Sequence, residues 1–440
     1  MNILIVETVW MGGATYKFFD KTLLTAFSLL PTLQAREIAA ITPKNHTVTV
    51  INERYTSIDF HKKYDVVHIN FVTSTAPHAY DIADTFRKNH VLVVLSGLHA
   101  SGVPGEAKQH ADSVLIGRPE LAWLQALQDI EQKQLKPFYE APPFDSSVRL
   151  PATMVSLPGF VVTGALEGTR GCPYQCDFCP ETNIAGGSQY YERPIDDVIS
   201  EMKNIPQRTL MFYDSSLTIH PEYTKNLFRK MKGMHKRFFC NGNVDVLARD
   251  PELVRLSKEA GCVAWLIGFE SVSQQTLDTI GKNTNRVDEY QHAVDNIHRH
   301  GMAVIGCFMF GFDSDTPAVF EETLRVVKEL RIDVADFSIL TPLPGTPLFQ
   351  RLDKEGRIRT KDWTHYNLKT VVFTPQHMTP EALLEGVQRM YKGFYAPSYT
   401  IQRVLGSLSD GLYTFFVVLS RNVIATMNSR RLFTRPKRNV

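Results

Sequence analysis

Three cysteines, Cys172, Cys176 and Cys179, lie within eight consecutive positions of this chain, in the segment RGCPYQCDFCP. Thiolates at C-x3-C-x2-C spacing are suited to three irons of a cubane [4Fe–4S] cluster. The fourth iron then has no protein ligand and can bind a small molecule. The alternative is structural zinc, which takes four protein ligands, and the nearest candidates, His220 and Cys240, are not at the usual spacing. The spacing therefore predicts a cluster with one open coordination site.

The elements around this motif alternate between strand-like and helical patterns. The motif directly follows the strand-like run VVTGALEGT, and further strand and helix signals alternate after it. Six such units fall short of a complete TIM barrel, so they predict an open, partial (β/α)6 barrel with its chemistry at the carboxyl ends of the strands. The other strands are expected at TLMFYD, RFFCNG, VAWLIGFES, MAVIGCFMFGF and DVADFSILTPL.

The first ~140 residues show a second alternation, which predicts a doubly wound parallel sheet of about five strands. A proline-rich stretch without a sustained period separates the two alternations and indicates a linker. The chain is thus an α/β protein with four expected parts: residues 1–140, a linker at 141–159, the barrel at 160–361 and a helical C-terminal region at 362–440. The N-terminal strands are expected at 2–8, 46–52, 64–71, 91–96 and 113–117.

Composition narrows the class of protein. The formal net charge is +2, from 48 basic and 46 acidic residues, which gives no electrostatic footprint for nucleic acid. Six cysteines are too few for a disulfide scaffold, and their clustering indicates metal binding in a reducing compartment. No stretch reaches about 18 uncharged apolar residues, and the N-terminus resembles a strand rather than a signal peptide. A cytoplasmic protein is expected.

RGCPYQCDFCPE resembles the cluster loop of radical S-adenosylmethionine enzymes, and its flanks resemble the subgroup with an N-terminal cobalamin-binding domain. The resemblance implies a [4Fe–4S] cluster on the three cysteines, bound S-adenosylmethionine, cobalamin, and an electron donor such as flavodoxin or ferredoxin. Members of this subgroup modify hopanoids, other lipids and pigments. Matches continue in order through YYERPIDDVISEM, FYDSSLTIHPEY, IGFESVSQQTLDTIGKNTN, FMFGFDSDT and LTPLPGTPL.

The same resemblance implies contacts with S-adenosylmethionine at or near the strand ends. For each residue taken alone, strand-end capping or core packing is the alternative, most clearly for the apolar Ile305. Ser215 stands where the subgroup usually has an acid, which weakens any exact role there. The implied residues are Phe178, Asp214, Ser215, Asn243, Glu270, Ser271 and Ile305.

A cobalamin site is implied by residues 96–123, SGLHASGVPGEAKQHADSVLIGRPELAW, which resemble part of cobalamin-binding domains. The loop ETVWMGGATYKF lacks the Asp-x-His-x-x-Gly motif, and His99 lies after the fourth strand instead, so cobalamin is expected to bind without a histidine ligand from that motif. The alternative is a domain that kept the fold and lost the ligand. Small residues that would let the cofactor approach the backbone are Gly12, Gly13, Ser74, Ser96, Gly97 and Gly117.

The remaining polar and sulfur-containing groups have simpler interpretations. Cys240, Cys262 and Cys307 lie among apolar neighbours and are expected in the core. The His-Arg-His run at 298–300 is expected to be a solvated helix end.

The C-terminal segment LYTFFVVLSRNVIATMNSRRLFTRPKRNV combines an apolar stretch with a basic end. It is either an interfacial membrane anchor or a helix docked on the barrel and followed by a frayed tail. An anchor would attach the protein peripherally to the inner face of the membrane. Its basic residues are Arg421, Arg430, Arg431, Arg435, Lys437 and Arg438.

The function that the resemblance implies is C-methylation of an unactivated carbon in a lipid, pigment or other small molecule. A 5′-deoxyadenosyl radical would abstract the hydrogen, and the methyl group would come from cobalamin. One alternative is a radical cyclase, oxidoreductase or carbon–carbon coupling enzyme without methyl transfer. An alternative of another class is a non-catalytic redox or cobalamin sensor.

Overall fold

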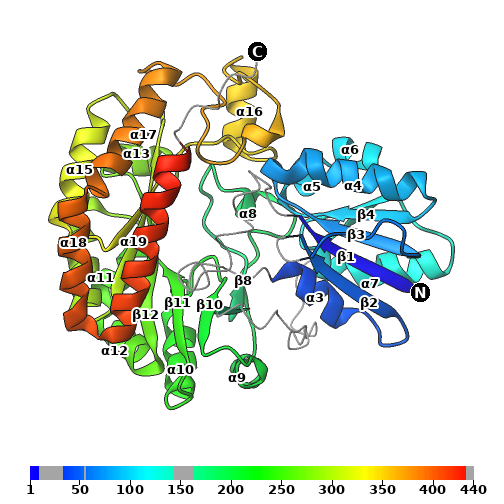
Figure 1. The fold of residues 1–440 in the computed structure, drawn as a ribbon, viewed down its shortest axis with the longest axis horizontal. Helices are drawn as coiled ribbons and strands as arrows, with labels where there is room; N and C mark the ends of the chain where they lie inside the picture. The colour runs from blue at the N-terminus through cyan, green and yellow to red at the C-terminus, as the bar shows by residue number, and fades with distance from the viewer. Residues whose placement is uncertain (9–32, 54–55, 143–162, 433–440) are drawn as a thin grey trace.

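The computed structural model describes residues 1–8, 33–53, 56–142 and 163–432, with side chains as far as residue 427. Two six-stranded parallel sheets lie side by side, and helices pack against each of them (Figure 1). Both sheets confirm the predicted α/β class. Gly12, Gly13 and most of the predicted linker lie outside the described residues, as do Arg435, Lys437 and Arg438 and the side chains of Arg430 and Arg431.

The N-terminal sheet has the strand order β2-β1-β3-β4-β5-β6, one short strand more than predicted. The additional strand, β6, uses residues that precede the proline-rich linker. The strands are β1 (Asn2–Glu7), β2 (Thr47–Asn52), β3 (Val66–Asn70), β4 (Leu92–Ser96), β5 (Ser113–Ile116) and β6 (Phe138–Glu140).

Helices cover both faces of this sheet, which is why its central strands are apolar at successive positions. On one face Ile3 and Ile5 pack with α3 (Gln34–Ile41) and α7 (Pro119–Glu131). On the other face Leu4 and Val6 pack with α4 (Ala76–Lys88). Shorter helical segments on the chain are η1 (Thr73–Thr75), α5 (Leu98–Gly102), α6 (Pro104–Ala107) and η2 (Lys108–His110).

The second sheet is the predicted open, partial barrel. Its strands lie side by side in chain order, β14-β13-β12-β11-β10-β7, and all neighbours are parallel. A two-stranded antiparallel sheet of β8 (Thr169–Arg170) and β9 (Tyr191–Glu192) follows its first strand. The strands are β7 (Thr163–Leu166), β10 (Thr209–Phe212), β11 (Arg237–Gly242), β12 (Cys262–Glu270), β13 (Ala303–Phe310) and β14 (Val334–Ile339).

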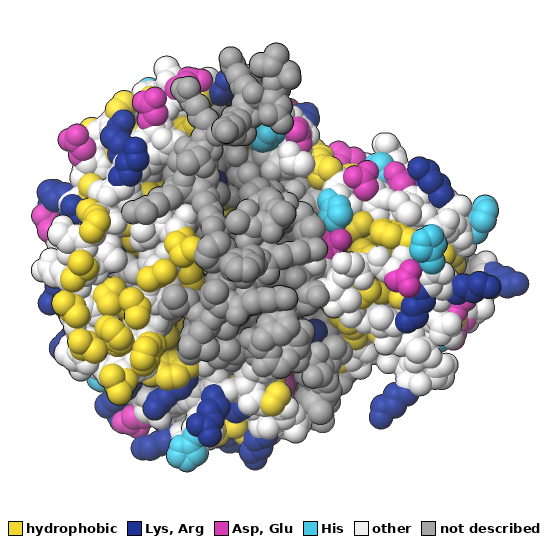
Figure 2. Space-filling model, viewed as in Figure 1, with side chains coloured by type: hydrophobic (Ala, Val, Ile, Leu, Met, Phe, Trp, Pro, Cys, Tyr) yellow, Lys and Arg dark blue, Asp and Glu magenta, His cyan; other side chains and the backbone are white. Residues whose placement is uncertain are grey.

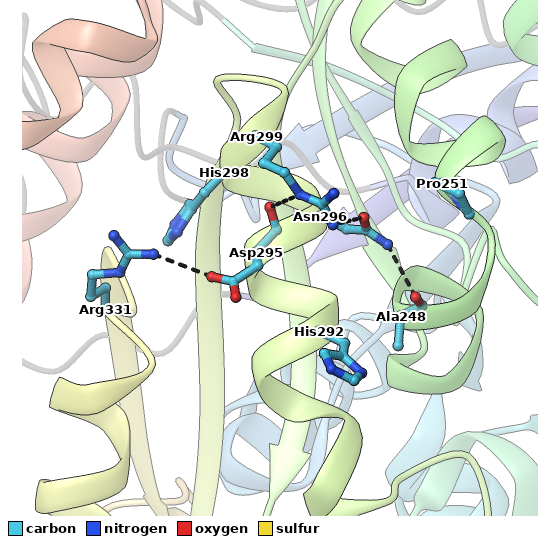
Figure 3. Close-up of a pocket in the computed structure, with 8 residues that line it drawn as sticks. All are labelled: Ala248, Pro251, His292, Asp295, Asn296, His298, Arg299 and Arg331. Atoms are coloured by element: carbon cyan, nitrogen blue, oxygen red, sulfur yellow. Dashed lines mark hydrogen bonds and ion pairs between the residues drawn. The ribbon is translucent and has the colours of Figure 1, made fainter.

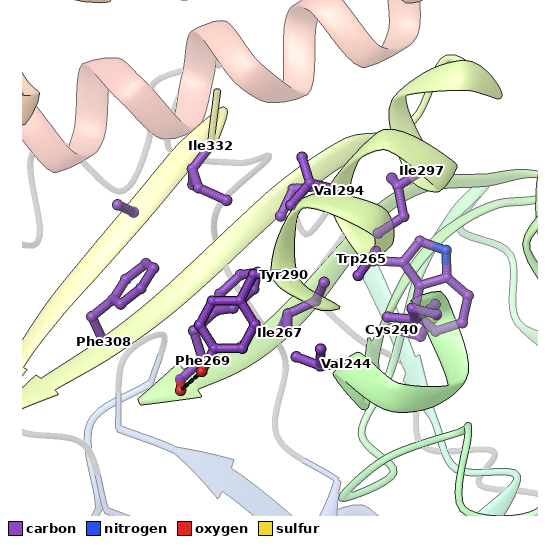
Figure 4. Close-up of a cluster of buried hydrophobic side chains, with 14 of the residues drawn as sticks. Cys240, Val244, Trp265, Ile267, Phe269, Tyr290, Val294, Ile297, Phe308 and Ile332 are labelled. Atoms are coloured by element: carbon purple, nitrogen blue, oxygen red, sulfur yellow. Dashed lines mark hydrogen bonds between the residues drawn. The ribbon is translucent and has the colours of Figure 1, made fainter. Parts of the chain in front are cut away.

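Alternate residues of the barrel strands point outward into the largest core (Figure 4). Trp265, Ile267 and Phe269 of β12 pack against α14 (Tyr290–Arg299), and the Phe269 and Phe308 rings stack with their centroids 5.3 Å apart. The Tyr290 hydroxyl donates to the Phe269 carbonyl at 2.9 Å. The remaining barrel helices are α8 (Pro180–Asn183), α9 (Ile195–Asn204), α10 (Pro221–Met231), α11 (Val244–Arg249), α12 (Pro251–Ala260), α13 (Gln274–Thr279), η3 (Val287–Glu289), α15 (Val319–Glu329) and α16 (Pro347–Lys354).

The C-terminal region is helical, as predicted, and its last helix covers the inner face of the barrel. This helix, α19 (Leu412–Leu432), packs Val417 and Val418 against Phe239 and Ile305, and the two valines are 6% and 0% exposed. Of the two interpretations of this segment, the docked helix is therefore the one that describes Val417 and Val418. No described helix is long and apolar enough to cross a membrane. The other elements are η4 (Trp363–His365), α17 (Pro380–Phe394), α18 (Pro397–Gly406) and η5 (Ser407–Asp410).

The two sheets are joined by contacts that the sequence patterns did not indicate. The Trp363 indole, at the start of the C-terminal region, donates to Glu106 at 2.8 Å and packs in the N-terminal core. At Gly102 the backbone of α5 meets Pro344, so closely that an added Cβ would lie 2.3 Å from the Pro344 carbonyl oxygen. Gly105, three residues later, has open space around it.

We predict that Gly102→Ala lowers the free energy of unfolding by about 1–3 kcal/mol, because the methyl group must displace backbone atoms that cannot rotate away. Gly105→Ala is the matched control and should be neutral or slightly stabilising. Thermal unfolding of the two variants beside the parent protein measures the difference. Equal losses in both variants would show that the contact at Pro344 does not hold the domains together.

Candidate functional site

The loop of Cys172, Cys176 and Cys179 begins where β8 ends, at the carboxyl end of the first barrel strand, as predicted. All three are free cysteines. The Asn183 amide donates to the carbonyl of Cys179 at 2.6 Å and to that of Cys176 at 3.3 Å, and the Cys172 amide donates to the Gly187 carbonyl at 3.0 Å. The backbone thus shapes the loop and leaves the thiols available as ligands.

Neither His220 nor Cys240 is a free fourth ligand for zinc. His220 lies 2.5 Å from a Glu192 oxygen, and Cys240 is buried in the outer core of the barrel. No trio of His, Cys, Asp or Glu in the described part of the chain is set to hold a single metal ion. A loop with three free thiols fits a cluster that takes one thiolate on each of three irons.

A lysine that was not singled out from the sequence lies beside the thiols. Lys282 Nζ is 3.2 Å from a Glu270 carboxylate oxygen. Burial alone would lower the pKa of Lys282, but Glu270 and the nearby thiols of Cys176 and Cys179 raise it overall. In turn, burial raises the pKa of Cys176 to about 11, and Lys282 opposes that rise. The ammonium group therefore supplies positive charge where thiolates must form.

Glu270 ends β12 in a conformation that few residues adopt. Its φ is +62°, in the left-handed region, although it is not a glycine. Such strain occurs at sites where the surrounding structure holds it in place. Here the contact with Lys282 does so, and Ser271 follows with its carbonyl accepting from the Tyr290 hydroxyl at 2.8 Å. The strand end is therefore rigid before any ligand binds.

Asp214 is buried beside the turn that precedes the cysteine loop. Its carboxylate accepts from the amides of Gly168, at 3.1 Å, and Thr169, at 2.5 Å, and from the Thr169 hydroxyl at 2.6 Å. These bonds fix the turn that leads into the cysteine loop. Burial nevertheless raises the pKa of Asp214. Ser215, beside it, is exposed.

Buried polar atoms without a hydrogen bond mark the end of β11. Among the residues that the structure describes, Oδ1 of Asn241, which was not predicted, has no partner, and Nδ2 of Asn243, predicted as a ligand contact, has none beyond the nearby Tyr174 hydroxyl. Buried polar atoms are rarely left unpaired unless a ligand or water bonds them. Phe178 lies partly buried beside Phe312, with ring centroids 6.3 Å apart. Ile305 lies in the core under α19, so the alternative of core packing is correct for this residue.

The predicted small residues that the structure describes contact either the N-terminal domain itself or the barrel. Ser96 Oγ accepts from the Asn70 amide at 2.9 Å. Gly97 has a φ of +114°, and a Cβ added there would lie 2.1 Å from the Phe71 carbonyl oxygen. Gly117 has a φ of +87°, and a Cβ added there would lie 2.4 Å from the Ala185 carbonyl oxygen. Ser74 is in η1. The Gly117 contact brings the carboxyl ends of the N-terminal strands to the segment that follows the cysteines.

His99 is fully buried. Its Nε2 is 3.3 Å from Glu106, and its ring packs 5.0 Å from that of Trp363. Of the other three cysteines, Cys240 and Cys262 are buried as predicted. Cys307 is only partly buried, because it lies on the inner face of β13 above the part that α19 covers.

A buried ion cluster anchors the cysteine loop to the N-terminal domain. Arg170, two residues before Cys172, contacts Glu37 of α3 and donates to Glu120 of α7 at 2.8 Å. Its Nε lies 3.0 Å from Glu167. Burial raises the pKa of Glu37 to about 7, although Arg170 lowers it. The guanidinium is thus held by carboxylates from both domains.

An open pocket lies at the opposite edge of the barrel (Figure 3). It has a volume of about 720 Å³ and lies where α14 ends, before the first residue of β13. His298 in this pocket lies 2.9 Å from Asp333, so it is paired and not solvated as expected. His300 bonds the Asn296 carbonyl at the helix end, where the run was expected to lie. Barrel chemistry takes place at the other edge, so this pocket is not the reaction site.

A partial barrel with three free thiols at the end of its first strand, docked on a doubly wound domain, defines an iron–sulfur enzyme that cleaves a bound cosubstrate. Comparison with known proteins agrees. Residues 166–327 match the radical SAM superfamily, and residues 346–412 match a domain of unknown function, DUF4070. The chain belongs to the radical S-adenosylmethionine superfamily, and it is an enzyme of that class.

Two relatives that match most of the chain are methyltransferases. The chain is 32% identical to the bacteriochlorophyllide d C-12(1)-methyltransferase of Chlorobaculum tepidum over 84% of its own length and 83% of the relative's. It is 28% identical to the C-8(2)-methyltransferase of the same organism, over 84% and 86%. The solved structure of the methyltransferase TsrM from Kitasatospora setae, with cobalamin and a [4Fe–4S] cluster bound, shares the fold with a TM-score of 0.71, 15% identity and coverage of 98% and 99%.

We predict that Cys172→Ala, Cys176→Ala and Cys179→Ala each abolish cluster binding, because each removes one of only three ligands. The parent protein, reconstituted without oxygen, should contain close to four irons and four sulfides per chain. Cys262→Ala, in the core, is the control and should keep them. Iron and sulfide analysis with visible absorption measures this, and stoichiometric zinc in the parent protein would contradict it.

Proposed function

We propose that this protein is a cobalamin-dependent radical S-adenosylmethionine C-methyltransferase that acts on an unactivated carbon of a small molecule, such as a pigment or lipid. The observation that carries the proposal is the Arg170 ion cluster, which holds a cobalamin-type domain directly against the cysteine loop. A methyl group and a radical must reach the same substrate carbon, so the two cofactor sites must face each other. The methyltransferase relatives, which match over more than four-fifths of the chain, support the same reaction.

In this proposal Cys172, Cys176 and Cys179 hold the cluster. When bound, the cluster supplies the electron that cleaves S-adenosylmethionine to methionine and a 5′-deoxyadenosyl radical. Lys282 stabilises the negative charge of the thiolates and of a bound carboxylate. The side-chain amides of Asn241 and Asn243 bond the polar groups of S-adenosylmethionine.

The other proposed contacts lie around the same strand ends. Glu270 and Ser271 would contact the methionine or ribose, and Phe178 the adenine. Ile305, which α19 covers, is the weakest candidate for an adenine contact. Asp214 would act indirectly, by holding the turn before the cysteines. Ser215 stays a weaker candidate.

Cobalamin would lie at the carboxyl ends of the N-terminal strands, near Ser74, Ser96, Gly97 and Gly117, with Gly12 and Gly13 as untested candidates. The residues present fit a cofactor bound without a histidine ligand, because His99 is buried against Glu106 and Trp363. The segment at Ala185 approaches Gly117, so a group bound at these strand ends would face the mouth of the barrel. The proposed division of the chain remains 1–140, 141–159, 160–361 and 362–440.

We predict that the anaerobically reconstituted protein, once reduced by dithionite or by a flavodoxin or ferredoxin, forms 5′-deoxyadenosine from S-adenosylmethionine. It should also retain added cobalamin through gel filtration. The triple cysteine-to-alanine variant is the control and should form none. Liquid chromatography with mass spectrometry measures the product.

Metabolite profiles of a deletion strain and its parent distinguish the alternatives. The parent should contain a compound one CH2 heavier than one that accumulates in the deletion strain. A pair of compounds that differ in mass by two hydrogens, or by the closure of a ring, would instead support a cyclase or oxidoreductase. A reconstituted cluster that never cleaves S-adenosylmethionine would leave the sensor as the remaining function.

The protein also exposes an apolar face suited to peripheral membrane contact. Hydrophobic side chains gather over α18 and α19, on the left of the view in Figure 2. Five large ones are between 46% and 71% exposed: Ile401, Leu405, Leu408, Leu412 and Phe416. Because Val417 and Val418 are in the core, the proposed contact is made by the outer side chains of α18 and α19. Exposed apolar patches of this kind mark contact sites with other molecules or membranes.

We predict that Leu405→Asp with Leu412→Asp removes binding to anionic vesicles, because two carboxylates would have to enter the apolar layer. Leu124→Asp, at a similarly exposed leucine of α7, is the matched control and should bind like the parent. Vesicle flotation at low and high salt measures binding. If the parent protein ignores vesicles of every composition, the face has another partner.

A further inference from the structure

Lys282 follows a sharp turn at the end of α13. Gly281 has a φ of +70°, in the left-handed region that glycine adopts readily. The Lys282 amide donates back to the Leu277 carbonyl at 2.9 Å. This is the geometry of a helix that ends at a glycine, and it reverses the direction of the chain just before the lysine.

The same turn is attached to the cysteine loop. The Asp177 amide donates to the Ile280 carbonyl at 3.3 Å, and the Cys176 thiol donates to the Gly281 carbonyl at 3.8 Å. Both contacts are made by the part of the loop at the second cysteine. The backbone that carries Lys282 therefore keeps a fixed position beside the thiols.

Gly268 leaves room for the pair of Lys282 and Glu270 on the inner face of the barrel. It lies two residues after Leu266, which packs on that face, and alternate residues of a strand share a face. A Cβ added at Gly268 would lie 2.4 Å from Oε1 of Glu270 and 3.3 Å from Nζ of Lys282. The Asn285 amide donates to the Gly268 carbonyl at 2.8 Å and holds the loop after the lysine against the strand. The ammonium group is thus fixed over the end of β12.

The thiols and the ammonium group interact electrostatically. Burial raises the pKa of Cys176, and Lys282 is the largest influence that opposes the rise. Burial also raises the pKa of Cys172, and the Tyr174 amide and Lys282 oppose it there. The Lys282 and Glu270 side chains are only 19% and 11% exposed, so water screens their charges weakly. A cation that favours thiolates at this place also favours any further negative charge added there.

We propose that Lys282 raises the reduction potential of the [4Fe–4S] cluster and that Glu270, by pairing with it, limits the rise. Reduction moves one electron from an external donor, such as dithionite or a reduced flavodoxin, to the cluster, and no covalent bond changes. The net charge around such a cluster is one of the factors that set its potential. The inference rests on the proposed placement of the cluster on the three cysteines, and it does not depend on cobalamin or on methyl transfer.

The pair has a consequence for the reaction of this enzyme class. A cluster with a higher potential takes its electron from the donor more readily, but it passes the electron to the sulfonium of S-adenosylmethionine with less driving force. A cation alone would favour the first step at the expense of the second. A cation partly offset by a carboxylate sets a value between the two extremes.

Potentiometric titration of the reconstituted full-length protein tests the proposal, with the electron paramagnetic resonance signal of the reduced cluster as the readout and without S-adenosylmethionine. Lys282→Met should make reduction about tenfold less favourable, which lowers the potential of a one-electron couple by about 59 mV. Lys282→Arg keeps the charge and should restore most of the parent potential. Lys232→Met is the matched control, because Lys232 also lies 3.2 Å from a glutamate, Glu259, but between α10 and the amino end of β11. It should keep the parent potential.

Glu270→Gln gives a second, opposite test. It removes the carboxylate and leaves the ammonium group, so the potential should rise. The double variant Lys282→Met with Glu270→Gln should lie near the parent, because both charges are gone. If Lys282→Met no longer holds four irons, the rise in Glu270→Gln supports the proposal and its absence overturns it. Equal falls in Lys282→Met and Lys282→Arg also overturn it, because an electrostatic effect must follow the charge.

Two further measurements separate this role from binding and from the proposed function. If Lys282→Met keeps the parent potential but weakens S-adenosylmethionine binding about tenfold in equilibrium dialysis, the ammonium group serves the carboxylate of that molecule and the proposal is wrong. Iron and sulfide analysis identifies which statement fails. A parent protein without a cluster overturns the proposed function together with this inference, whereas a cluster whose potential ignores both charges overturns this inference alone.

Discussion

The buried guanidinium of Arg170 is the constraint on which the arrangement of the molecule depends. Two of its carboxylate partners, Glu37 and Glu120, belong to the N-terminal domain, and the third, Glu167, precedes it in the barrel. Removing one side of such a cluster leaves charge buried without compensation, which typically costs about 3–5 kcal/mol. The domains therefore cannot separate without a large loss of stability. Because Cys172 follows two residues later, the cysteine loop is positioned by the same interaction.

Smaller contacts then carry this constraint to the site. Asp214 gathers the amides of the turn before Arg170, and the Gly117 backbone approaches the segment after the cysteines. The thiols thus lie between two fixed points of one loop. On the other side of the loop, the strained Glu270 and its partner Lys282 hold a charge pair at the end of β12. A site assembled in this way keeps its geometry before a cofactor binds, which favours selective radical chemistry.

The strands and the cysteine loop could be predicted from the sequence because they depend on local periodicity and spacing. The partners of Arg170 could not, because Glu37 is 133 residues away and no local pattern links the two. Lys282 lay inside a segment that was recognised, but its role depends on the backbone turn at Glu270 that brings the two together. The apolar run in α19 was compatible with a membrane or a core, and only the tertiary structure shows which of its residues pack inward.

The rotation of α19 about its axis gives its two faces different consequences. Because Val417 and Val418 must cover the inner face of the barrel, Leu412 and Phe416 are left on the outside, and Arg421 turns inward. A helix that only sealed the core would not expose Leu412 and Phe416, and one that only anchored the protein would not bury Val417 and Val418. Under the membrane-contact proposal, the inner side of the helix seals the barrel and its outer side brings the enzyme to a membrane surface, where an apolar substrate would be found.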